Sequence, residues 1–260
     1  MLDRIVADVR RDLETRMTPQ SYDAVRSNAE ARPAARDFRA AIGRAGVSLI
    51  AEVKKASPSR GAIRPDLDAV QVAETYAGAG ADAISMLTES RYFGGSLDDL
   101  SRADETLGRD GPPLLRKDFI VDPYQVYEAR AHGADCVLLI AALLCHSKLA
   151  RMLHISRELG MASLVETHDE ADVARAVACG APIIGINSRD LHTLEVDLAT
   201  FERLRSHIPP GTLVVAESGM RGRNDVERIA RAGVDAVLVG EAIMSARDMK
   251  AKIGELRCDA

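Results

Sequence analysis

Short apolar runs recur along the chain, and four of them follow the same junction of Gly, then Ala or Val, then Asp or Pro. The junctions begin at Gly80, Gly133, Gly180 and Gly233, so they lie 53, 47 and 53 residues apart. A glycine in the left-handed conformation often ends a helix, and the apolar run after it suits a buried strand of a parallel sheet. The pattern therefore predicts repeated helix–turn–strand units. Four unrelated helix ends are the alternative, because the repeat is less faithful than that of a solenoid.

Further apolar runs fill the intervals and bring the predicted strands to eight. They cover residues 49–53, 113–116, 162–165 and 212–216. Amphipathic stretches with helical spacing lie between the strands, for example at residues 68–79, 123–131, 169–178 and 224–232. Strict alternation of strand and helix favours a closed parallel barrel. The predicted fold class is therefore α/β, a single (β/α)8 TIM barrel over residues 46–260.

The first 45 residues precede the first predicted strand. An apolar stripe at helical spacing is formed by Leu2, Ile5, Val6, Val9, Leu13 and Met17, and a second short helix is predicted at residues 38–42. We interpret residues 1–45 as an N-terminal helical extension packed on the barrel, with its stripe over the rim of the pocket. A helix that binds a partner or dimerises would present the same stripe.

Composition limits the class of protein. A chain of 260 residues fits one closed α/β barrel, which typically needs about 250 residues. Hydrophobic residues make up 47% and charged residues 28%, as in ordinary globular proteins. No apolar run approaches the roughly 18 to 20 residues of a membrane helix, and the charged N-terminus does not resemble a signal peptide. We expect a cytoplasmic protein with no membrane partner.

Charge and cysteine content exclude further classes. The net charge of −5 argues against a nucleic-acid partner, which selects basic surfaces. The four cysteines (Cys136, Cys145, Cys179, Cys258) form no CxxC pair, and three of them are expected to pack in apolar surroundings without disulfides. Neither a zinc-like His/Cys spacing nor a GxSxG motif occurs, so no metal and no serine acyl transfer are indicated. We expect a monomer or a weak homodimer.

Polar residues keep one parity on five predicted strands. Because side chains alternate across a strand, Ile50, Glu52 and Lys54 share one face. The same alternation connects Leu115 with Lys117, Leu164 with Glu166, Gly185 with Asn187, and Val215 with Glu217. One charged residue at a strand end is ordinarily a solvated edge. Polar residues at the same parity on five strands indicate groups aimed into the mouth of the barrel, because burying polar groups is costly unless they have a task.

Two glycine-containing loops, ESGMRG and GEAIMS, follow the last two predicted strands. Barrels often bind phosphate at this place, on backbone N–H groups. Gly219 and Gly240 would let the backbone approach an oxyanion, while Ser57 and Lys54 would add a hydroxyl donor and a positive charge. Either loop alone is also compatible with a plain turn. Their pairing favours a small phosphorylated substrate.

Longer sequence runs carry a family resemblance over nearly the whole chain. They are LIAEVKKASPSRGAIR, SMLTESRYFGGSLDDL, LLRKDFIVDPYQVYEARAHGAD, LVETH, IGINSRDL, VAESGM and LVGEAIM. With these runs the chain closely resembles indole-3-glycerol phosphate synthase, an enzyme family of tryptophan biosynthesis. The resemblance implies ring closure of 1-(2-carboxyphenylamino)-1-deoxyribulose 5-phosphate to indole-3-glycerol phosphate, with loss of carbon dioxide and water and without a cofactor.

The resemblance also implies roles for the strand-end residues. The implied catalytic set is Glu52, Lys54, Lys117, Glu166, Asn187 and Glu217, and the implied substrate- and phosphate-binding set is Ser57, Phe93, Arg189, Ser218, Gly219, Gly240 and Glu241. Lys117 would protonate the keto oxygen and Glu166 would be the base of the dehydration. Lys54 would be either the second acid or a clamp on the substrate carboxylate. Phe93 and Phe119 would wall the apolar ring, although core packing is the alternative for Phe119.

Three other functions stay open on the residues. A sugar-phosphate isomerase such as phosphoribosylanthranilate isomerase and a flavin-dependent barrel oxidoreductase would both bind phosphate at the same loops. A catalytically inactive barrel would serve as a scaffold. The set of Glu52, Lys54 and Lys117 argues against the isomerase, and the intact acid and base residues argue against an inactive barrel.

Overall fold

Eight parallel strands close on themselves in the computed structural model, which describes residues 1–57, 61–64, 66–190 and 195–257. The strands are β1 (Ser48–Val53), β4 (Ala83–Leu87), β5 (Leu114–Lys117), β6 (Cys136–Ile140), β7 (Ala162–Thr167), β8 (Ile183–Asn187), β9 (Leu213–Glu217) and β10 (Ala236–Val239). Neighbours in the chain are neighbours in the sheet, and β10 pairs with β1 to complete the ring. The predicted (β/α)8 barrel is confirmed.

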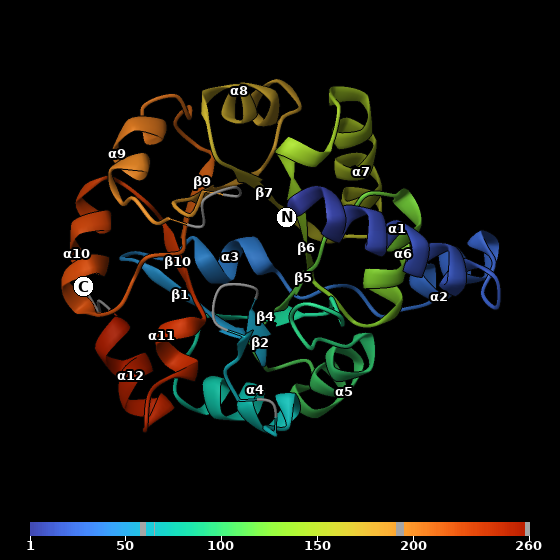
Figure 1. Cartoon of the computed structure of the whole chain (residues 1–260), viewed down its shortest axis with the longest axis horizontal. Coiled ribbons are helices and arrows are strands. Elements are labelled where there is room, and N and C mark those ends of the chain that lie inside the picture. Colours follow the sequence, from blue (N-terminus) through green and yellow to red (C-terminus); the bar gives the residue numbers. More distant parts are fainter. Residues whose placement is uncertain (58–60, 65, 191–194, 258–260) are drawn as a thin grey trace.

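Helices surround the barrel in chain order (Figure 1). They are α4 (Ala69–Gly78), α5 (Leu97–Leu107), α6 (Pro123–Ala131), α7 (His146–Glu158), α8 (Glu170–Ala178), α9 (Ala199–Arg205), α10 (Arg223–Arg231), α11 (Glu241–Met244) and α12 (Met249–Leu256). A short hairpin of β2 (Ala56–Ser57) and β3 (Gly61–Ala62) follows β1, and the 3-10 turn η1 (Ala141–Leu143) follows β6. In the described part of the chain, no helix is both long and apolar enough to span a membrane.

Alternate residues of each strand pack on opposite sides of the barrel wall. Ile50, Leu115, Leu164, Ile183 and Val215 are buried in one cluster inside the barrel. Their strand neighbours, such as Leu49, Leu114 and Val214, pack in a second cluster between the strands and the helices. The predicted parity is therefore confirmed, and each polar residue two positions beyond an inner side chain lies on the inner face at the strand end.

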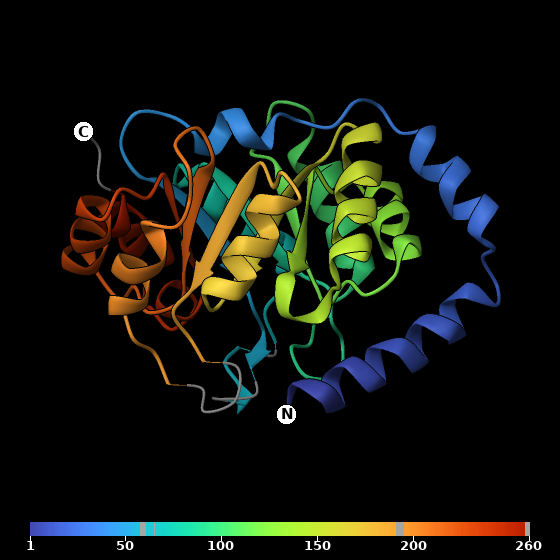
Figure 2. The same cartoon turned by 90° about the horizontal axis from the view of Figure 1, so that it is seen from above.

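The N-terminal residues form three helices, two of which lie at opposite ends of the barrel. Helix α1 (Leu2–Met17) crosses the end where the β2–β3 hairpin lies, whereas α3 (Phe38–Ile42) lies at the opposite end (Figure 2). Phe38 and Ile42 are buried with the inner side chains of the barrel, so α3 packs into its base. Helix α2 (Tyr22–Glu30) was not predicted, because its apolar face is short. Its N-cap is Ser21, whose Oγ accepts a hydrogen bond from the backbone N–H of Ala24.

The cysteine prediction is partly wrong. Cys136 is buried inside the barrel and Cys179 is half-buried, but Cys145 is exposed at the start of α7. Its run of apolar neighbours ends in a turn rather than continuing as a buried strand, and this explains the error. Cys258 lies outside the described residues.

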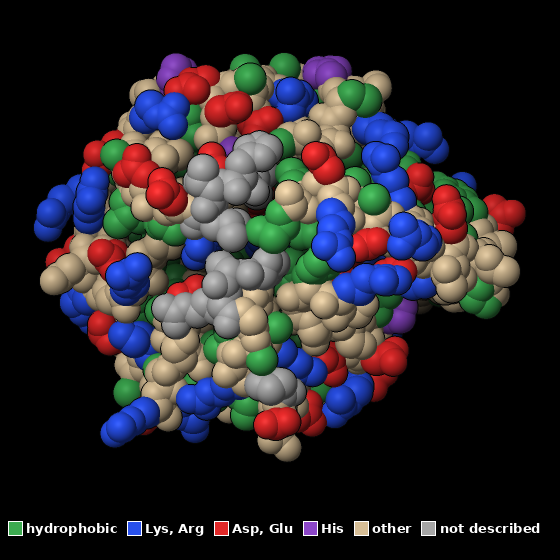
Figure 3. Space-filling view, viewed as in Figure 1, with side chains coloured by type: hydrophobic (Ala, Val, Ile, Leu, Met, Phe, Trp, Pro, Cys, Tyr) green, Lys and Arg blue, Asp and Glu red, His purple; other side chains and the backbone are tan. Residues whose placement is uncertain are grey.

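Figure 3 shows acidic and basic side chains intermingled on the face seen down the barrel.

Candidate active site

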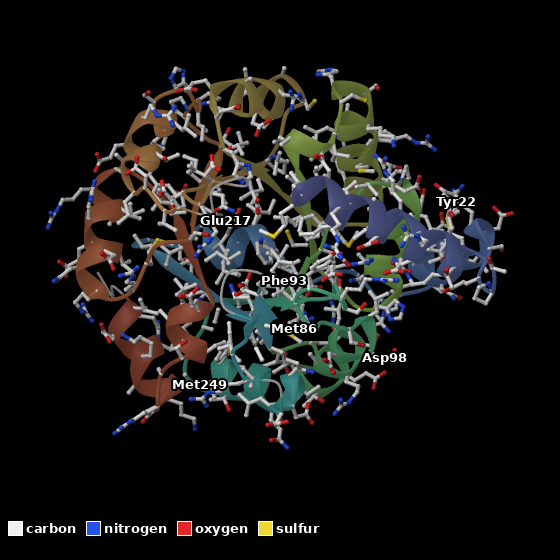
Figure 4. The ribbon with its side chains drawn as sticks, in the orientation of Figure 1. Tyr22, Met86, Phe93, Asp98, Glu217 and Met249 are labelled. Atoms are coloured by element: carbon white, nitrogen blue, oxygen red, sulfur yellow. The ribbon has the colours of Figure 1, made fainter. Side chains whose placement is uncertain are left out.

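A cavity of about 500 Å³ opens at the C-terminal end of the strands. Its lining includes every site residue proposed from the sequence: Glu52, Lys54, Ser57, Phe93, Lys117, Glu166, Asn187, Arg189, Glu217, Ser218, Gly219, Gly240 and Glu241. Figure 4 places Glu217 and Phe93 over the centre of the barrel, and Tyr22 far out on α2. Active sites of this fold lie at this end, because the loops that follow the strands meet there.

The base of the cavity holds five titratable groups from four strands. Glu52, Glu166 and Glu217 are all less than 5% exposed. Lys54 Nζ lies 2.7 Å from Glu52 Oε1, so these two form one ion pair. Lys117 Nζ lies 3.2 Å from Glu166 Oε2 and 3.5 Å from Glu217 Oε2. Three carboxyl groups thus surround two ammonium groups, where little solvent screens them.

The surroundings of Lys117 fix its charge. Burial disfavours the ammonium form, but Glu166, Glu217 and Glu52 outweigh burial and raise the pKa of Lys117 above its usual value. Burial also acts against the carboxylate of Glu52, but Lys54 and Lys117 outweigh it and lower the pKa of Glu52. Lys117 is therefore an ammonium group at neutral pH, and it carries a proton into the centre of the cavity.

Glu166 and Glu217 lie in contrasting environments. Burial alone would raise the pKa of Glu166, but Lys117, His168 and Asn187 outweigh it and hold that pKa well below the ordinary carboxyl range. Burial raises the pKa of Glu217, and the adjacent Glu166 raises it further. Among the described residues, no group donates a hydrogen bond to either Glu217 oxygen. Two carboxyl groups with opposite shifts commonly have different acid–base roles.

A glycine on the neighbouring strand makes room for Glu217. Gly185 of β8 lies beneath it, and a Cβ atom built there would be 2.1 Å from Glu217 Oε1. Asn187, two residues further along β8, is paired with Glu217 in the sheet register. The Asn187 side chain donates to Glu166 Oε1 at 3.2 Å and accepts from the Arg189 backbone N–H at 3.0 Å. Strand β8 thus separates and orients the two carboxyl groups.

The candidate phosphate site lies beside this cluster. Ser218 and Gly219 both have left-handed φ values, 69° and 90°, which is unusual for a serine. A Cβ atom at Gly240 would lie 2.5 Å from Glu52 Oε1, so a larger residue here would displace the Glu52 side chain. Arg189 reaches across the rim, 3.8 Å from Glu241. The backbone at the ends of β9 and β10 therefore approaches the cavity closely, as a phosphate cradle requires.

An apolar wall faces the charged cluster. The Phe93 and Phe119 rings lie 6.1 Å apart at an angle of 41°. Both line the cavity, together with Leu2 and Ile5 of α1. Phe119 also packs against the inner barrel cluster and against α1, so it has the core packing that was the alternative for it. A flat aromatic substrate fits between such a wall and the ammonium groups opposite.

Sequence reasoning missed several groups near the cavity. Arg221 and Lys252 line its rim, and Lys252 Nζ donates to the Arg221 backbone oxygen at 3.1 Å. Nothing in the periodicity of α12 marks Lys252 as a rim residue. His168 contacts Glu166 from behind, and its parity with Glu166 on the LVETH run was the available signal. Within residues 1–57, 61–64, 66–190 and 195–257, no group of three or more His, Cys, Asp or Glu side chains is arranged to hold a metal ion.

Comparison with known proteins places these features in a family. The family profile described as "Indole-3-glycerol phosphate synthase" matches residues 2–256. The indole-3-glycerol phosphate synthase of Mycobacterium ulcerans is 47% identical over 256 residues, covering 98% of this chain and 93% of that protein. That of Dehalococcoides mccartyi is 54% identical over 210 residues, 81% of each.

Solved structures support the fold at lower identity. The crystal structure of 3-hexulose-6-phosphate synthase from Salmonella typhimurium has a TM-score of 0.65 at 16% identity, and covers 81% of this chain and 96% of that one. At this identity the likeness concerns the fold alone. The family match rests on sequence over the whole described barrel, and the chain belongs to the indole-3-glycerol phosphate synthase family.

Proposed function

We propose that this chain closes the indole ring of indole-3-glycerol phosphate from 1-(2-carboxyphenylamino)-1-deoxyribulose 5-phosphate, as a decarboxylating lyase of tryptophan biosynthesis. The observation that carries the proposal is the Lys117 ammonium group, held between Glu166 and Glu217 at the base of a cavity with an apolar wall. The family membership supports it. It also sets aside the isomerase, flavin-dependent and scaffold alternatives.

The first chemical step needs an acid at the keto oxygen. As the ring carbon that bears the carboxylate bonds to the keto carbon, negative charge develops on the keto oxygen. Lys117 donates its proton there, which converts the oxygen to a hydroxyl group. The carboxyl group then leaves as carbon dioxide, and its bonding electrons remain in the ring system. A dry, charged site favours this step, because the developing charge is met by fixed groups rather than by water.

The second step is a dehydration, which needs one base and one acid. Glu166 is held as a carboxylate and takes the proton from the carbon next to the anilino nitrogen. Lys54 protonates the departing hydroxyl group. If Lys54 instead clamps the substrate carboxylate in the first step, Lys117 gives this second proton after it has been reprotonated from solvent. Counted over both steps, two protons are given to oxygen and one is taken from carbon. One proton is therefore consumed, which matches the loss of a carboxylate as neutral carbon dioxide.

The remaining site residues orient the reactants. Glu52 pairs with Lys54, while Asn187 and Glu217 lie against Glu166 and Lys117 and orient them. Ser57, Arg189, Ser218, Gly219, Gly240 and Glu241 form the phosphate end of the cavity. Phe93 and Phe119 contact the aromatic ring. Lys117, Glu166 and Lys54 account for every proton transfer, so the proposed reaction uses neither a metal ion nor an organic cofactor.

The proposal extends to the protein's surroundings. A small phosphorylated molecule is its substrate, and no nucleic acid or membrane takes part. We place the enzyme in the cytoplasm and expect a monomer or a weak homodimer. The net charge of −5 and the mixed charges of the face that carries the cavity support the absence of a nucleic-acid partner.

A fluorescence assay tests the function directly. Purified protein, dialysed against a chelator, is mixed with the carboxyphenylamino substrate, and the fluorescence of indole-3-glycerol phosphate is followed without added metal or cofactor. We expect full activity. Activity restored only by a divalent ion would overturn the metal-free chemistry, and no product under any of these conditions would overturn the function.

A further inference from the structure

A buried histidine lies behind the proposed base, outside the lining of the cavity. His168 follows the last residue of β7, and its side chain is only 13% exposed. Its Nε2 lies 3.2 Å from Glu166 Oε1, and its Nδ1 lies 3.8 Å from Asp172 Oδ2. Neither ring nitrogen makes a hydrogen bond of good geometry to a described residue, so each contact is an ion pair only when the ring is protonated.

The elements around His168 present mainly acidic side chains to it. Glu166 of β7 and Glu217 of β9 lie on the cavity side, and Asp172 of α8 lies on the outer side. The cations nearby are already shared: Lys117 of β5 contacts Glu166 and Glu217, and Arg175 donates to Asp172 at 3.0 Å. Asp172 is fixed further, because its Oδ2 accepts the backbone N–H of His168.

This arrangement favours the imidazolium form. Burial lowers the pKa of His168, but Asp172, Glu166 and Glu217 outweigh burial and raise it to about 10. An upward pKa shift is expected for a histidine with acidic neighbours, so the ring is charged below a pH of about 10 and across neutral pH. The buried cluster at the base of the cavity thereby gains a third cation.

The two oxygens of Glu166 have different partners. Oε1 is contacted by His168 and accepts from Asn187 Nδ2 at 3.2 Å, whereas Oε2 is contacted by Lys117. When Lys117 turns to the keto oxygen of the substrate, Oε2 loses its partner and Oε1 does not. The free oxygen of the base is then Oε2, on the cavity side.

We propose that His168, backed by Asp172, is a positioning residue that keeps Glu166 ionised and directs its Oε2 atom at the substrate. The inference rests on the proposed function, because it takes Glu166 as the base of the dehydration. His168 itself does not touch the substrate. Its effect passes through the charge and orientation of Glu166, in the way that a carboxylate orients a histidine in other acid–base sites.

The test replaces the ring by neutral side chains and measures the pH dependence of single-turnover rates. Without the imidazolium, the buried Glu166 carboxylate loses a neighbouring cation, so its pKa rises. In His168→Asn and His168→Gln we expect the acidic limb of the rate profile to move up by about one pH unit or more. The rate at neutral pH should fall roughly tenfold, with KM changed less than about twofold because ground-state contacts are kept. His154→Asn, at an exposed position of α7, is the matched control and should match the wild type.

Two further measurements separate the possible failures. Nitrogen NMR of the ring in the resting wild-type enzyme reports its charge without any turnover, and a neutral imidazole at pH 7 would overturn the inference. Glu166→Gln is assayed beside the histidine variants. If it keeps full turnover, the base assigned under the proposed function is wrong. If it loses turnover while the histidine variants keep the wild-type acidic limb, only the role of His168 is wrong.

Discussion

Lys117 combines three properties: it is mostly buried, it is charged, and it lines the same cavity as the apolar wall. We predict that Lys117→Met lowers turnover by roughly two to four orders of magnitude, the usual contribution of a positioned general acid. Methionine keeps an unbranched stem of similar length, so the protein should stay folded. Turnover and its ratio to KM should fall together, because the proton is needed in the transition state.

Lys54→Met is the matched comparison, since Lys54 has a carboxylate partner of its own in Glu52. If Lys117 is instead a clamp, its replacement will raise KM while turnover changes little, and the acid role passes to Lys54. If the two lysines serve one shared proton transfer, the double variant will lose less than the sum of the single losses. Steady-state kinetics on the three variants decide between these assignments.

A smaller change on β8 tests the geometry around Glu217. Gly185→Ala puts a methyl group where the Glu217 carboxyl group now lies, so that side chain must move away from Lys117. We expect turnover to fall about tenfold or more, and overpacking to destabilise the fold by about 1 to 3 kcal/mol. Gly254→Ala in α12 is the control, because nothing lies within 4 Å of its Cβ position. Kinetics and thermal melts of both variants test this, and normal turnover in Gly185→Ala would mean that Glu217 need not stay in place.

For single residues, the sequence predicts which strand side chains enter the cavity, but not which of them form ion pairs. Parity assigns Glu52, Lys117, Glu166 and Glu217 to one face because a strand has only two faces. The pairing of Lys117 with two carboxyl groups depends on the stagger between strands, which no single strand encodes. His168 was missed because its side chain acts from behind the cavity.

At the scale of elements, α1 connects the rim of the cavity to its outer wall. Ile5, Val6 and Val9 pack against Val121, with Phe119 beside them. Other contacts of α1 are polar: Tyr92 donates to Asp8 at 2.6 Å, and Arg16 donates to Glu128 at 2.8 Å. The apolar stripe was predictable from spacing alone. These polar contacts were not, since they join residues about 80 to 110 positions apart.

Removing α1 tests what the helix contributes to binding. We predict that a chain lacking residues 1–17 still folds, because the barrel strands pair without it, and that its KM rises about tenfold through loss of the wall formed by Leu2 and Ile5. Turnover should change less. Tyr92→Phe, which removes the hydrogen bond to Asp8 and leaves the helix in the chain, is the control and should bind substrate nearly as the wild type.

The truncation stops before α3 for a structural reason. Phe38 is 1% exposed and packs with the inner side chains of the barrel, so α3 closes the base. Phe38→Ala should cost about 3 to 5 kcal/mol of stability, as for other buried aromatic residues. We therefore propose that the extension of residues 1–45 has two parts, with α1 serving the cavity and α3 serving the core. Denaturant unfolding of Phe38→Ala beside the shorter truncation tests this division, and an unchanged unfolding midpoint in Phe38→Ala would contradict it.

For the whole molecule, the barrel could be predicted because the same helix–turn–strand pattern recurs along the sequence. Each helix–turn–strand junction at Gly80, Gly133, Gly180 and Gly233 gives the same local structure, and closure follows from the number of units. Helix α2 escaped prediction because its apolar face is short and because it packs on α6, outside the repeat. The repeat also does not encode how the buried acidic groups at the mouth of the barrel change the free energy of unfolding.

Glu217 is expected to make the folded protein less stable as pH rises. Its native pKa lies above that of an ordinary carboxyl group, because of burial and then of Glu166, so the native state holds a proton that the unfolded chain has already released. Native protein then binds more protons than unfolded protein, and the free energy of unfolding falls as pH rises from the ordinary carboxyl range toward the raised pKa. Glu217→Gln stays neutral and removes this loss. We predict that the variant melts a few degrees above the wild type at pH 8, with a smaller difference at pH 5, while its turnover falls because the carboxyl group serves the reaction. Glu158→Gln, at an exposed position of α7, should leave both melting temperatures unchanged. Equal gains at pH 5 and pH 8 would show that Glu217 does not change its charge between them, and the raised pKa would then be wrong.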